Sequence, residues 1–269
     1  MKGYSRQTLN RVLRELGVRR GATLLLHSRL FALGPLIETP VANIPDAIID
    51  CFMKLLGPYG TLVLPTYFYE YAREQQPFNC HGRQVSREMG ALAVAALERS
   101  QARRSAHPVF NLPALGYHAA KLAGKQGRTA FGTESAWDML TRLDARMLFF
   151  GVLPAEAMTY IHYIEHHFGV PHAYHKMFLV PVNYGRRQRA SSTTAFVRHR
   201  DFAVTYRLVR FMEYLAGCGA LRRRRLGSGS VWSVNMQSAL NCGTACLVRD
   251  PYYFLEREPA FIAGVPPLV

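Results

Sequence analysis

The stretch "ATLLLHSRL" (residues 22–30) decides the fold, because its apolar run predicts a strand buried on both faces that runs into a turn. A helix is expected next over residues 41–57, and Gly57 ends it. "GTLVLPTY" (residues 60–67) then predicts a second buried strand, which Pro65 ends. This β-α-β order favours parallel pairing of the two strands with a right-handed crossover.

The flanking sequence extends this pattern in both directions. An N-terminal helix is predicted over residues 5–17, with Ser5 as N-cap, and "RMLFFGV" (residues 146–152) is a third apolar strand. Further elements are expected as follows: strands at 105–116, 176–185, 193–202 and 221–226, and helices at 88–101, 117–123, 206–216 and 237–246, together with a turn that feeds a helix whose first residues include Thr133 and Glu134. We therefore expect one α/β domain over residues 1–269, with a mixed central β-sheet flanked by helices and a more antiparallel C-terminal part.

Composition limits the class of protein. The chain has 269 residues and a formal charge of +15, with 28 Arg against 5 Lys. Arginine runs at residues 186–189 and 222–225 make the part after residue 181 denser in positive charge. Such a field favours polyanionic partners, a phosphate-rich cofactor among them, although charge runs are usually solvated faces.

Cysteine usage and hydropathy narrow the expected compartment. The five cysteines contain no Cys-x-x-Cys pair, which argues against a disulfide framework and a structural zinc site. Apolar runs such as residues 91–97 are far shorter than a membrane span, and the N-terminal segment is charged rather than signal-like. We expect a cytoplasmic protein without membrane insertion.

The stretch "MTYIHYIEHHFGVPH" (residues 158–172) concentrates histidines around one glutamate. On a helix, Thr159, His162, Glu165 and His166 would share one face, and Glu165 would accept the N–H of an imidazole three residues away. The same letters spell H-x-x-E-H, a zinc peptidase pattern, but zinc would need a third ligand that nothing else singles out. A cluster of histidines with only a structural role is the remaining interpretation.

Five blocks in a fixed order carry a resemblance to a known family. They are "LLLHSRL" (24–30), "GTLVLPTY" (60–67), "REMGALAVAALERSQARRSAHPV" (87–109), "AFGTESAWDML" (130–140) and "MTYIHYIEH" (158–166). Together they make the chain resemble the aminoglycoside 3-N-acetyltransferase family over about residues 5–185. The resemblance implies transfer of an acyl group, acetyl by default, from coenzyme A to an amine of a sugar. No cysteine stands in an evident Cys/His arrangement, so we expect direct transfer rather than an acyl-enzyme, and we expect no metal.

The resemblance also implies roles for individual residues. His162 would be the general base, Glu165 its partner, and Thr159 a neighbour on the same face. An imidazole supported by a carboxylate suits removal of a proton from an ammonium near neutral pH. Coenzyme A would be surrounded by residues from four turns: His27, Ser28, Arg29, Pro65, Thr66, Arg104, Ser105, His107, Phe131, Gly132 and Ser135. Arg103 and Arg104 would pair with its phosphate oxygens. Thr66 and Ser28 are candidates for stabilising the oxyanion.

The acceptor amine is expected from charge alone. Aminoglycosides are polycations, so a chain of +15 favours an anionic acceptor instead, such as a nucleotide-linked amino sugar used in polysaccharide or glycoconjugate synthesis. Antibiotic modification is the alternative. Nucleic-acid binding rests on the same charge but lacks any recognised motif, so no nucleic-acid partner is expected. Residues 184–200 could form an edge hairpin that pairs two subunits in a homodimer.

Overall fold

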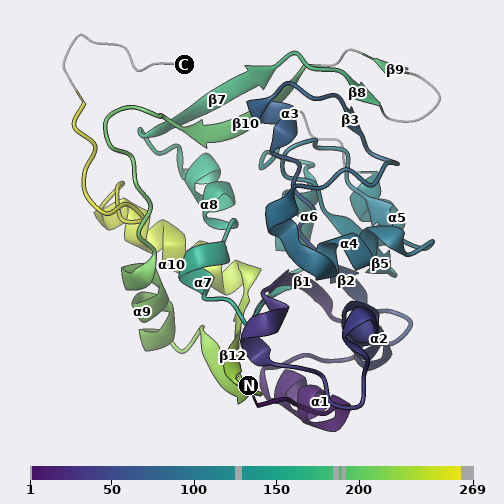
Figure 1. Ribbon diagram of the computed structural model, residues 1–269. Helices are drawn as coiled ribbons and strands as arrows, with labels where there is room; N and C mark the ends of the chain where they lie inside the picture. The colour runs from purple at the N-terminus through teal and green to yellow at the C-terminus, as the bar shows by residue number, and fades with distance from the viewer. Residues whose placement is uncertain (1, 125–128, 184–187, 190–191, 262–269) are drawn as a thin grey trace.

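The computed structural model describes residues 2–124, 129–183, 188–189 and 192–261, and it is built on a seven-stranded sheet with strand order β11-β12-β6-β1-β2-β5-β4 (Figure 1). β1 pairs in parallel with β2 and β6, and the other neighbours pair antiparallel. The strands are β1 (Thr23–Ser28), β2 (Thr61–Val63), β4 (Arg103–Arg104), β5 (Pro113–Gly116), β6 (Arg146–Phe150), β11 (Arg222–Leu226) and β12 (Gly229–Asn235). The expected α/β class with a mixed central sheet is confirmed.

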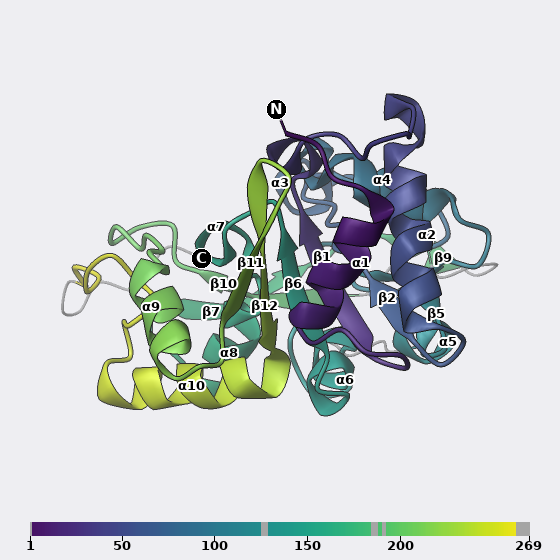
Figure 2. The same cartoon turned by 90° about the horizontal axis from the view of Figure 1, so that it is seen from below.

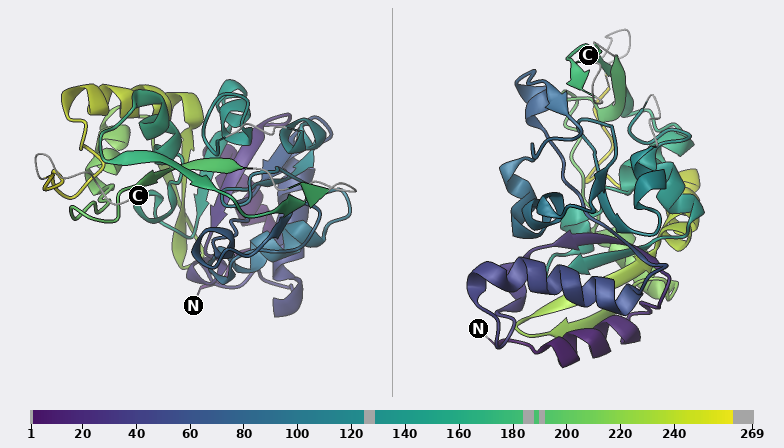
Figure 3. Two further views of the ribbon diagram at one scale, coloured as in Figure 1. Left: turned by 90° about the horizontal axis from the view of Figure 1, so that it is seen from above. Right: turned by 90° about the vertical axis from the view of Figure 1, so that its right-hand side faces the viewer.

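Helices cover both faces of this sheet (Figures 2 and 3). One face packs against α1 (Arg6–Glu15), α2 (Ile44–Leu56) and α4 (Gly90–Glu98). The other packs against α6 (Ala136–Arg142), α8 (Ile161–Phe168) and α10 (Met236–Arg249). The other helices are α3 (Glu70–Arg73), α5 (Ala119–Ala123), α7 (Pro154–Ala157), α9 (Val209–Gly217) and the 3-10 turns η1 (Leu30–Leu33), η2 (Val41–Asn43) and η3 (Arg87–Met89).

The alternation of side chains along β1 explains its continuous apolar sequence. Leu24 and Leu26 belong to the core under α1, α2 and α4, whereas Leu25 belongs to the core on the opposite face. Both faces are covered, so the strand has no polar side. His27 follows the same alternation and stacks on Phe149 of β6, with ring centroids 5.1 Å apart. The strand therefore orients His27 toward the face that carries α8.

Several element boundaries differ from the sequence predictions. Residues 105–112 form a loop between β4 and β5 rather than a strand, because the Ser105 hydroxyl accepts the N–H of Leu112 and closes the loop. α6 begins at Ala136, after Thr133 and Glu134, because Ser135 caps it by accepting the N–H of Asp138. β12 was not predicted. Together with β11 it forms a hairpin that adds two strands from the basic C-terminal part to the central sheet.

Two small sheets lie beyond α8, at the top of Figure 1. β7 (Ala173–Phe178) pairs antiparallel with β10 (Thr193–Arg198), and β8 (Val182–Asn183) lies between β3 (Phe78–Asn79) and β9 (Gln188–Arg189). The single strand predicted over residues 176–185 is therefore divided between two sheets. Residues 184–187 and 190–191, which include two arginines of the 186–189 run and much of the predicted edge hairpin, lie outside the described residues. Across the described ranges, no helix combines the length and apolarity required to cross a bilayer.

Candidate active site

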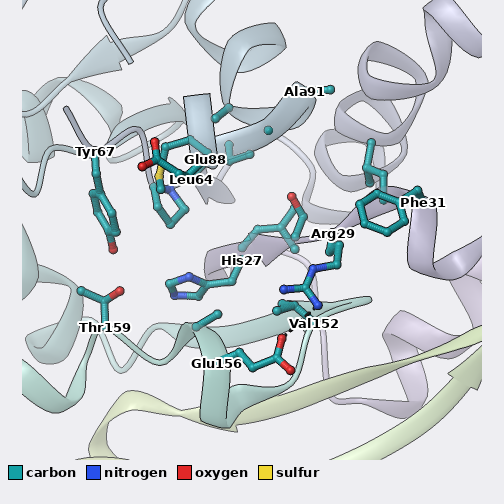
Figure 4. A pocket seen from close by; sticks show the side chains of 18 of the residues that line it. His27, Arg29, Phe31, Leu64, Tyr67, Glu88, Ala91, Val152, Glu156 and Thr159 are labelled. Atoms are coloured by element: carbon teal, nitrogen blue, oxygen red, sulfur yellow. Dashed lines mark ion pairs between the residues drawn. The ribbon is translucent and has the colours of Figure 1, made fainter. Parts of the chain in front are cut away.

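A pocket of about 520 Å³ opens at the carboxyl ends of β1 and β2 (Figure 4). Ligands of α/β proteins commonly bind at this edge, where strand ends and the following turns converge. The pocket gathers five residues predicted from the sequence: His27, Ser28, Arg29, Pro65 and Thr159. Tyr67, Glu88 and Glu156 also line it. Four residues assigned to coenzyme A thus share one cavity with Thr159, whereas His162 and Glu165 do not line it.

The turn after β1 is fixed by its neighbour in the sheet. The Arg29 N–H donates to the carbonyl of Phe150 at 2.9 Å, which continues the pairing of β1 with β6 past the strand end. Gly151 follows with φ of 75°, and a Cβ there would lie 2.5 Å from the Arg29 carbonyl oxygen. Only glycine permits this approach. The Arg29 side chain then crosses the pocket mouth to Glu156, with 2.9 Å between nitrogen and oxygen.

A second constellation is centred on Glu165 in α8. His162 Nδ1 lies 3.0 Å from Glu165 Oε2, and Tyr206 Oη donates to the same oxygen at 2.8 Å. His172 Nε2 lies 2.9 Å from the other oxygen, Oε1. Glu165 and His172 are fully buried, whereas the His162 side chain keeps 26% of its exposure. The predicted pair of His162 and Glu165 is therefore in contact, and its imidazole remains open to solvent.

The three donors set the charge state of Glu165. Burial alone would raise its pKa, but hydrogen bonds from His162 and His172 outweigh burial and lower the pKa below the usual value of a glutamate. The carboxylate therefore stays anionic and accepts the Nδ1–H of His162. In this tautomer the lone pair on Nε2 of His162 is free to accept a proton.

Thr159 lies outside the helix that the sequence suggested, and the ring of His166 has other neighbours than the pair. α8 begins only at Ile161, so Thr159 precedes it and accepts the backbone N–H of His162 through its carbonyl at 3.0 Å. His166 packs against His175 and Phe196, with ring centroids 4.8 and 5.3 Å away. His162 and His166 therefore do not converge. Within the residues that the structure describes, no group of three or more His, Cys, Asp or Glu side chains is arranged to hold a metal ion.

Thr66 and Arg104 serve a buried polar network beside the pocket. The Thr66 hydroxyl donates to Asn111 Oδ1 at 2.6 Å, and Arg104 Nε donates to the same oxygen at 2.8 Å. Arg104 also donates to the backbone carbonyls of Thr66, Gly82 and Gln84. Burial lowers the pKa of Arg104 to about 9. Its donors are directed at protein carbonyls, in contrast to the phosphate contacts expected from the sequence.

The remaining residues predicted for coenzyme A lie around α6 and the 105–112 loop. Ser105, His107 and Ser135 border a separate hollow of about 10 Å³, too small for a cofactor. His107 accepts the N–H of Phe110 at Nδ1 and lies 3.1 Å from the Thr194 carbonyl at Nε2. The Gly132 N–H donates to Thr129 Oγ1 at 2.7 Å, and the buried Phe131 ring lies 5.9 Å from His162. Phe131 therefore lies beside His162, and none of these residues lines the pocket of about 520 Å³.

Three residues at the site were not assigned from the sequence. His172 and Tyr206 contact Glu165 from positions 7 and 41 residues further along the chain, both after the end of α8 at Phe168, so helical spacing does not bring them to it. Tyr67 lines the pocket at the end of the second predicted strand. The only local signal was for Tyr67, since it follows Pro65 and Thr66 at a strand end, where ligand-binding residues gather.

Comparison with known proteins agrees with this geometry. The family model for aminoglycoside 3-N-acetyltransferase matches residues 25–248, which include the pocket, α8 and Tyr206. The chain belongs to the aminoglycoside 3-N-acetyltransferase family. The match extends well past the blocks from which the resemblance was inferred, so the C-terminal hairpin and α9 belong to the family fold as well.

Individual members of the family are distant relatives of this chain. Aminoglycoside N(3)-acetyltransferase III from Salmonella sp is 28% identical over 178 residues, 60% of either chain, and the type III enzyme from Pseudomonas aeruginosa is 26% identical over 167 residues, 56% of this chain and 59% of its own length. The matched region thus spans about 60% of these curated relatives.

Solved structures share the fold over nearly the whole chain. Aminoglycoside acetyltransferase AAC(3)-Xa has a TM-score of 0.78 at 20% identity and covers 94% of both chains. AAC-IIIb, solved as a binary complex with CoASH, has a TM-score of 0.77 at 20% identity and covers 95% of this chain and 99% of its own. At such identities the likeness concerns the fold.

Proposed function

We propose that this protein transfers an acetyl group from acetyl-CoA to an amine of an aminoglycoside. The proposal depends above all on the contact of 3.0 Å between His162 Nδ1 and the buried carboxylate of Glu165, next to the pocket that contains Thr159. Family membership supports it, as do two solved relatives: AAC-IIIb is a complex with CoASH, and AAC-VIa is bound to sisomicin.

The proposed reaction begins with the amine. An aminoglycoside amine is an ammonium at neutral pH, and it becomes a nucleophile only after it loses a proton. Nε2 of His162 accepts this proton while Nδ1–H donates to Glu165. The amine nitrogen attacks the thioester carbon, the C–N bond forms and the C–S bond breaks. The nitrogen, which carries a positive charge after the attack, releases its second proton to solvent. The thiolate of coenzyme A takes the first proton back from His162, so the products are an amide, free CoASH and one proton.

Tyr206 and His172 act as positioning residues in this proposal. Tyr206 donates to the oxygen that His162 also contacts, and His172 contacts the other oxygen of Glu165. A carboxylate fixed by three donors cannot rotate away from the imidazole, and its negative charge stabilises the imidazolium that forms during transfer. The pair therefore keeps its geometry before the substrate arrives, which lowers the reorganisation needed during the reaction.

The choice of an aminoglycoside replaces the anionic acceptor expected from net charge. The arginines of residues 222–225 lie on β11, the edge strand, which β12 and β6 separate from β1. None of the four lines the pocket, whose charged residues are Arg29, Glu88 and Glu156. The charge of the whole chain therefore does not describe the field at the site, and it gives no reason to prefer a nucleotide-linked sugar over the acceptors named for relatives.

Release of free thiol from acetyl-CoA tests the proposal. We expect turnover with a panel of aminoglycosides and none above background with nucleotide-linked amino sugars. Acetyl-CoA should also raise the melting temperature, because it binds only the native state. His162→Ala should abolish transfer while the thermal shift by acetyl-CoA remains. Turnover only with nucleotide-linked sugars would favour the anionic acceptor, and near-normal turnover of His162→Ala would contradict the role of His162.

A further inference from the structure

The inner end of the pocket contains polar groups that lack a hydrogen-bond partner among the residues described by the structure. His27 comes from β1, Tyr67 from the segment after β2, and Thr159 from the segment before α8, and their polar ends approach one another in Figure 4. His27 is 6% and Tyr67 3% exposed. Neither His27 Nε2 nor Tyr67 Oη makes a hydrogen bond with any part of the chain that the structure describes. Buried polar groups normally have partners, so a ligand atom is expected here.

His27 is a neutral donor. Burial lowers its pKa to about 3, so the imidazole is uncharged at neutral pH and carries a single N–H. Its ring is held flat against Phe149, with an angle of 7° between the planes. Such an imidazole cannot act as a general base near neutrality. With the proton on Nε2 it donates a hydrogen bond into the pocket.

Tyr67 is a second neutral donor in the same place. Burial raises its pKa well above the usual value of a tyrosine, so the hydroxyl keeps its proton. The Thr159 hydroxyl is near enough to favour ionisation of Tyr67 slightly, but the two do not form a full hydrogen bond. The Tyr67 ring packs against Phe110 and Trp137, with centroids 5.4 and 6.5 Å away. Its position is therefore fixed independently of the hydroxyl.

The surroundings define which ligand atom these donors suit. The charged side chains of the pocket, Arg29, Glu88 and Glu156, form ion pairs with one another or with Arg73. Two neutral donors, without a charged residue between them, match an oxygen that is neutral in the substrate and gains negative charge only during the reaction. Such an oxygen is the carbonyl oxygen of a thioester.

We propose that His27 Nε2–H and Tyr67 Oη–H form the oxyanion hole of the acyl-transfer reaction and bind the carbonyl oxygen of the acyl thioester. This inference rests on the proposed function. When the amine attacks, the electron pair of the C=O bond moves to this oxygen, and the two hydrogen bonds shorten. When the C–S bond breaks, the pair returns and the carbonyl re-forms. The donors neither gain nor lose a proton.

The arrangement also places the donors near the base. Phe110 is the common neighbour: its ring centroid lies 5.4 Å from Tyr67 and 6.4 Å from His162. Thr159, opposite Tyr67 in the pocket, is joined to His162 by the backbone hydrogen bond at the start of α8. In this proposal the carbon of a thioester held by His27 and Tyr67 faces the wall that contains Thr159, and His162, which does not itself line the pocket, lies behind that wall.

Two variants and one control test the proposal. Tyr67→Phe removes only the hydroxyl, and His27→Phe keeps the ring stacked on Phe149. Each should lower kcat by about 100-fold or more, the usual effect of losing one oxyanion donor. The Kd of CoASH should change by less than about 3-fold, because CoASH has no thioester carbonyl. Tyr71→Phe is the control: its hydroxyl donates to the Val180 carbonyl at 2.8 Å, outside the pocket, so only stability should fall.

Stability separates this role from a structural one. His27→Phe replaces a buried, unpaired imidazole nitrogen with carbon, so the melting temperature should stay constant or rise by a few degrees while kcat falls. A melting temperature that falls together with kcat in both variants would mean that these residues act through the fold, and would overturn the proposal. So would a kcat within about 3-fold of wild type, or a raised KM for the aminoglycoside alone. If the wild-type protein acylates no aminoglycoside, the proposed function fails first.

Discussion

Two regions of the molecule differ in whether their buried polar groups have hydrogen-bond partners: the surroundings of Glu165 and the inner end of the pocket. Around Glu165, three donors converge on the two oxygens of one carboxylate, and each is within 3.0 Å of its acceptor. At the inner end of the pocket, His27 and Tyr67 offer donors with no acceptor among the residues that the structure describes. Both places lie in the same core, on the face of the sheet that carries α8.

In the proposed reaction, this difference separates the groups that are already paired within the protein from those that await a substrate atom. The base and its support are assembled before any ligand binds, because a buried carboxylate without donors would be costly. The donors at His27 and Tyr67 lack partners because the missing acceptor belongs to the substrate. The unpaired donors at the inner end of the pocket are thus expected to lower the stability of the protein. A mutation that removes one of them should raise stability and lower turnover together.

Replacing Glu165 should have the largest effect on turnover, because it removes the acceptor that His162, His172 and Tyr206 share. Glu165→Gln keeps the shape but brings an NH2 group toward donors from His162, His172 and Tyr206. The tautomer of His162 is no longer fixed, and kcat should fall by about 1000-fold or more. Thiol release measures kcat, and the thermal shift by acetyl-CoA, which should persist, serves as the control. A loss of less than about 10-fold would mean that His162 does not depend on the carboxylate.

Arg104 provides a contrasting case of a buried charge without a carboxylate. Its donors are satisfied by Asn111 Oδ1 and by backbone carbonyls. Arg104→Met leaves these oxygens unpaired and should cost about 2–4 kcal/mol of unfolding free energy, measured by urea denaturation. The Kd of CoASH should not change. Arg103→Met, at the exposed neighbour, should change neither quantity. Weaker CoASH binding by a folded Arg104→Met protein would restore the phosphate contact expected from the sequence.

These cases also show what the sequence can reveal. The order of strands and helices around β1 was predictable, because three apolar runs separated by helical segments leave few arrangements of a parallel core. The contact between His162 and Glu165 was predictable too, since their spacing alone brings them together on a helix. β12 was missed because serines interrupt its alternation, as in "GSVWSVN" (residues 229–235).

Contacts between distant residues were beyond such reasoning. His172 and Tyr206 reach Glu165 through the path of the chain after α8, which no local period encodes. Arg104 and Thr66 belong to blocks that resemble the family. The sequence could not reveal that the side chains of both donate hydrogen bonds to Asn111 Oδ1. Equally, nothing in "LLLHSRL" (residues 24–30) distinguishes a histidine with a partner from one without.

Acid should destabilise the protein through three imidazoles, one of them in the pocket. Burial lowers the pKa of His27 to about 3 and those of His107 and His166 to about 4. Below pH 6.5 the unfolded chain binds protons that the native protein does not, so stability is greatest above pH 6.5 and falls toward pH 4. Each imidazole contributes up to about 1.4 kcal/mol per pH unit. Urea denaturation at about pH 7, 6 and 5 measures the slope, which should be shallower in His27→Phe. A slope unchanged in that variant would show that His27 is not buried as a neutral group.

A mutation at the mouth of the pocket should have the smallest effect. The polar groups there are of a third kind, paired but partly exposed to solvent. Arg29 and Glu156 are paired, but their side chains remain 46% and 44% exposed. Such pairs contribute about 0.5 kcal/mol or less, so Arg29→Ala should hardly change the melting temperature. Because Arg29 lines the outer part of the pocket, its loss should raise the KM for acetyl-CoA several-fold and leave kcat unchanged, as expected for binding that is equal in the ground and transition states. The opposite pattern, a lower kcat at constant KM, would place the reacting carbonyl near the mouth instead of beside His27 and Tyr67.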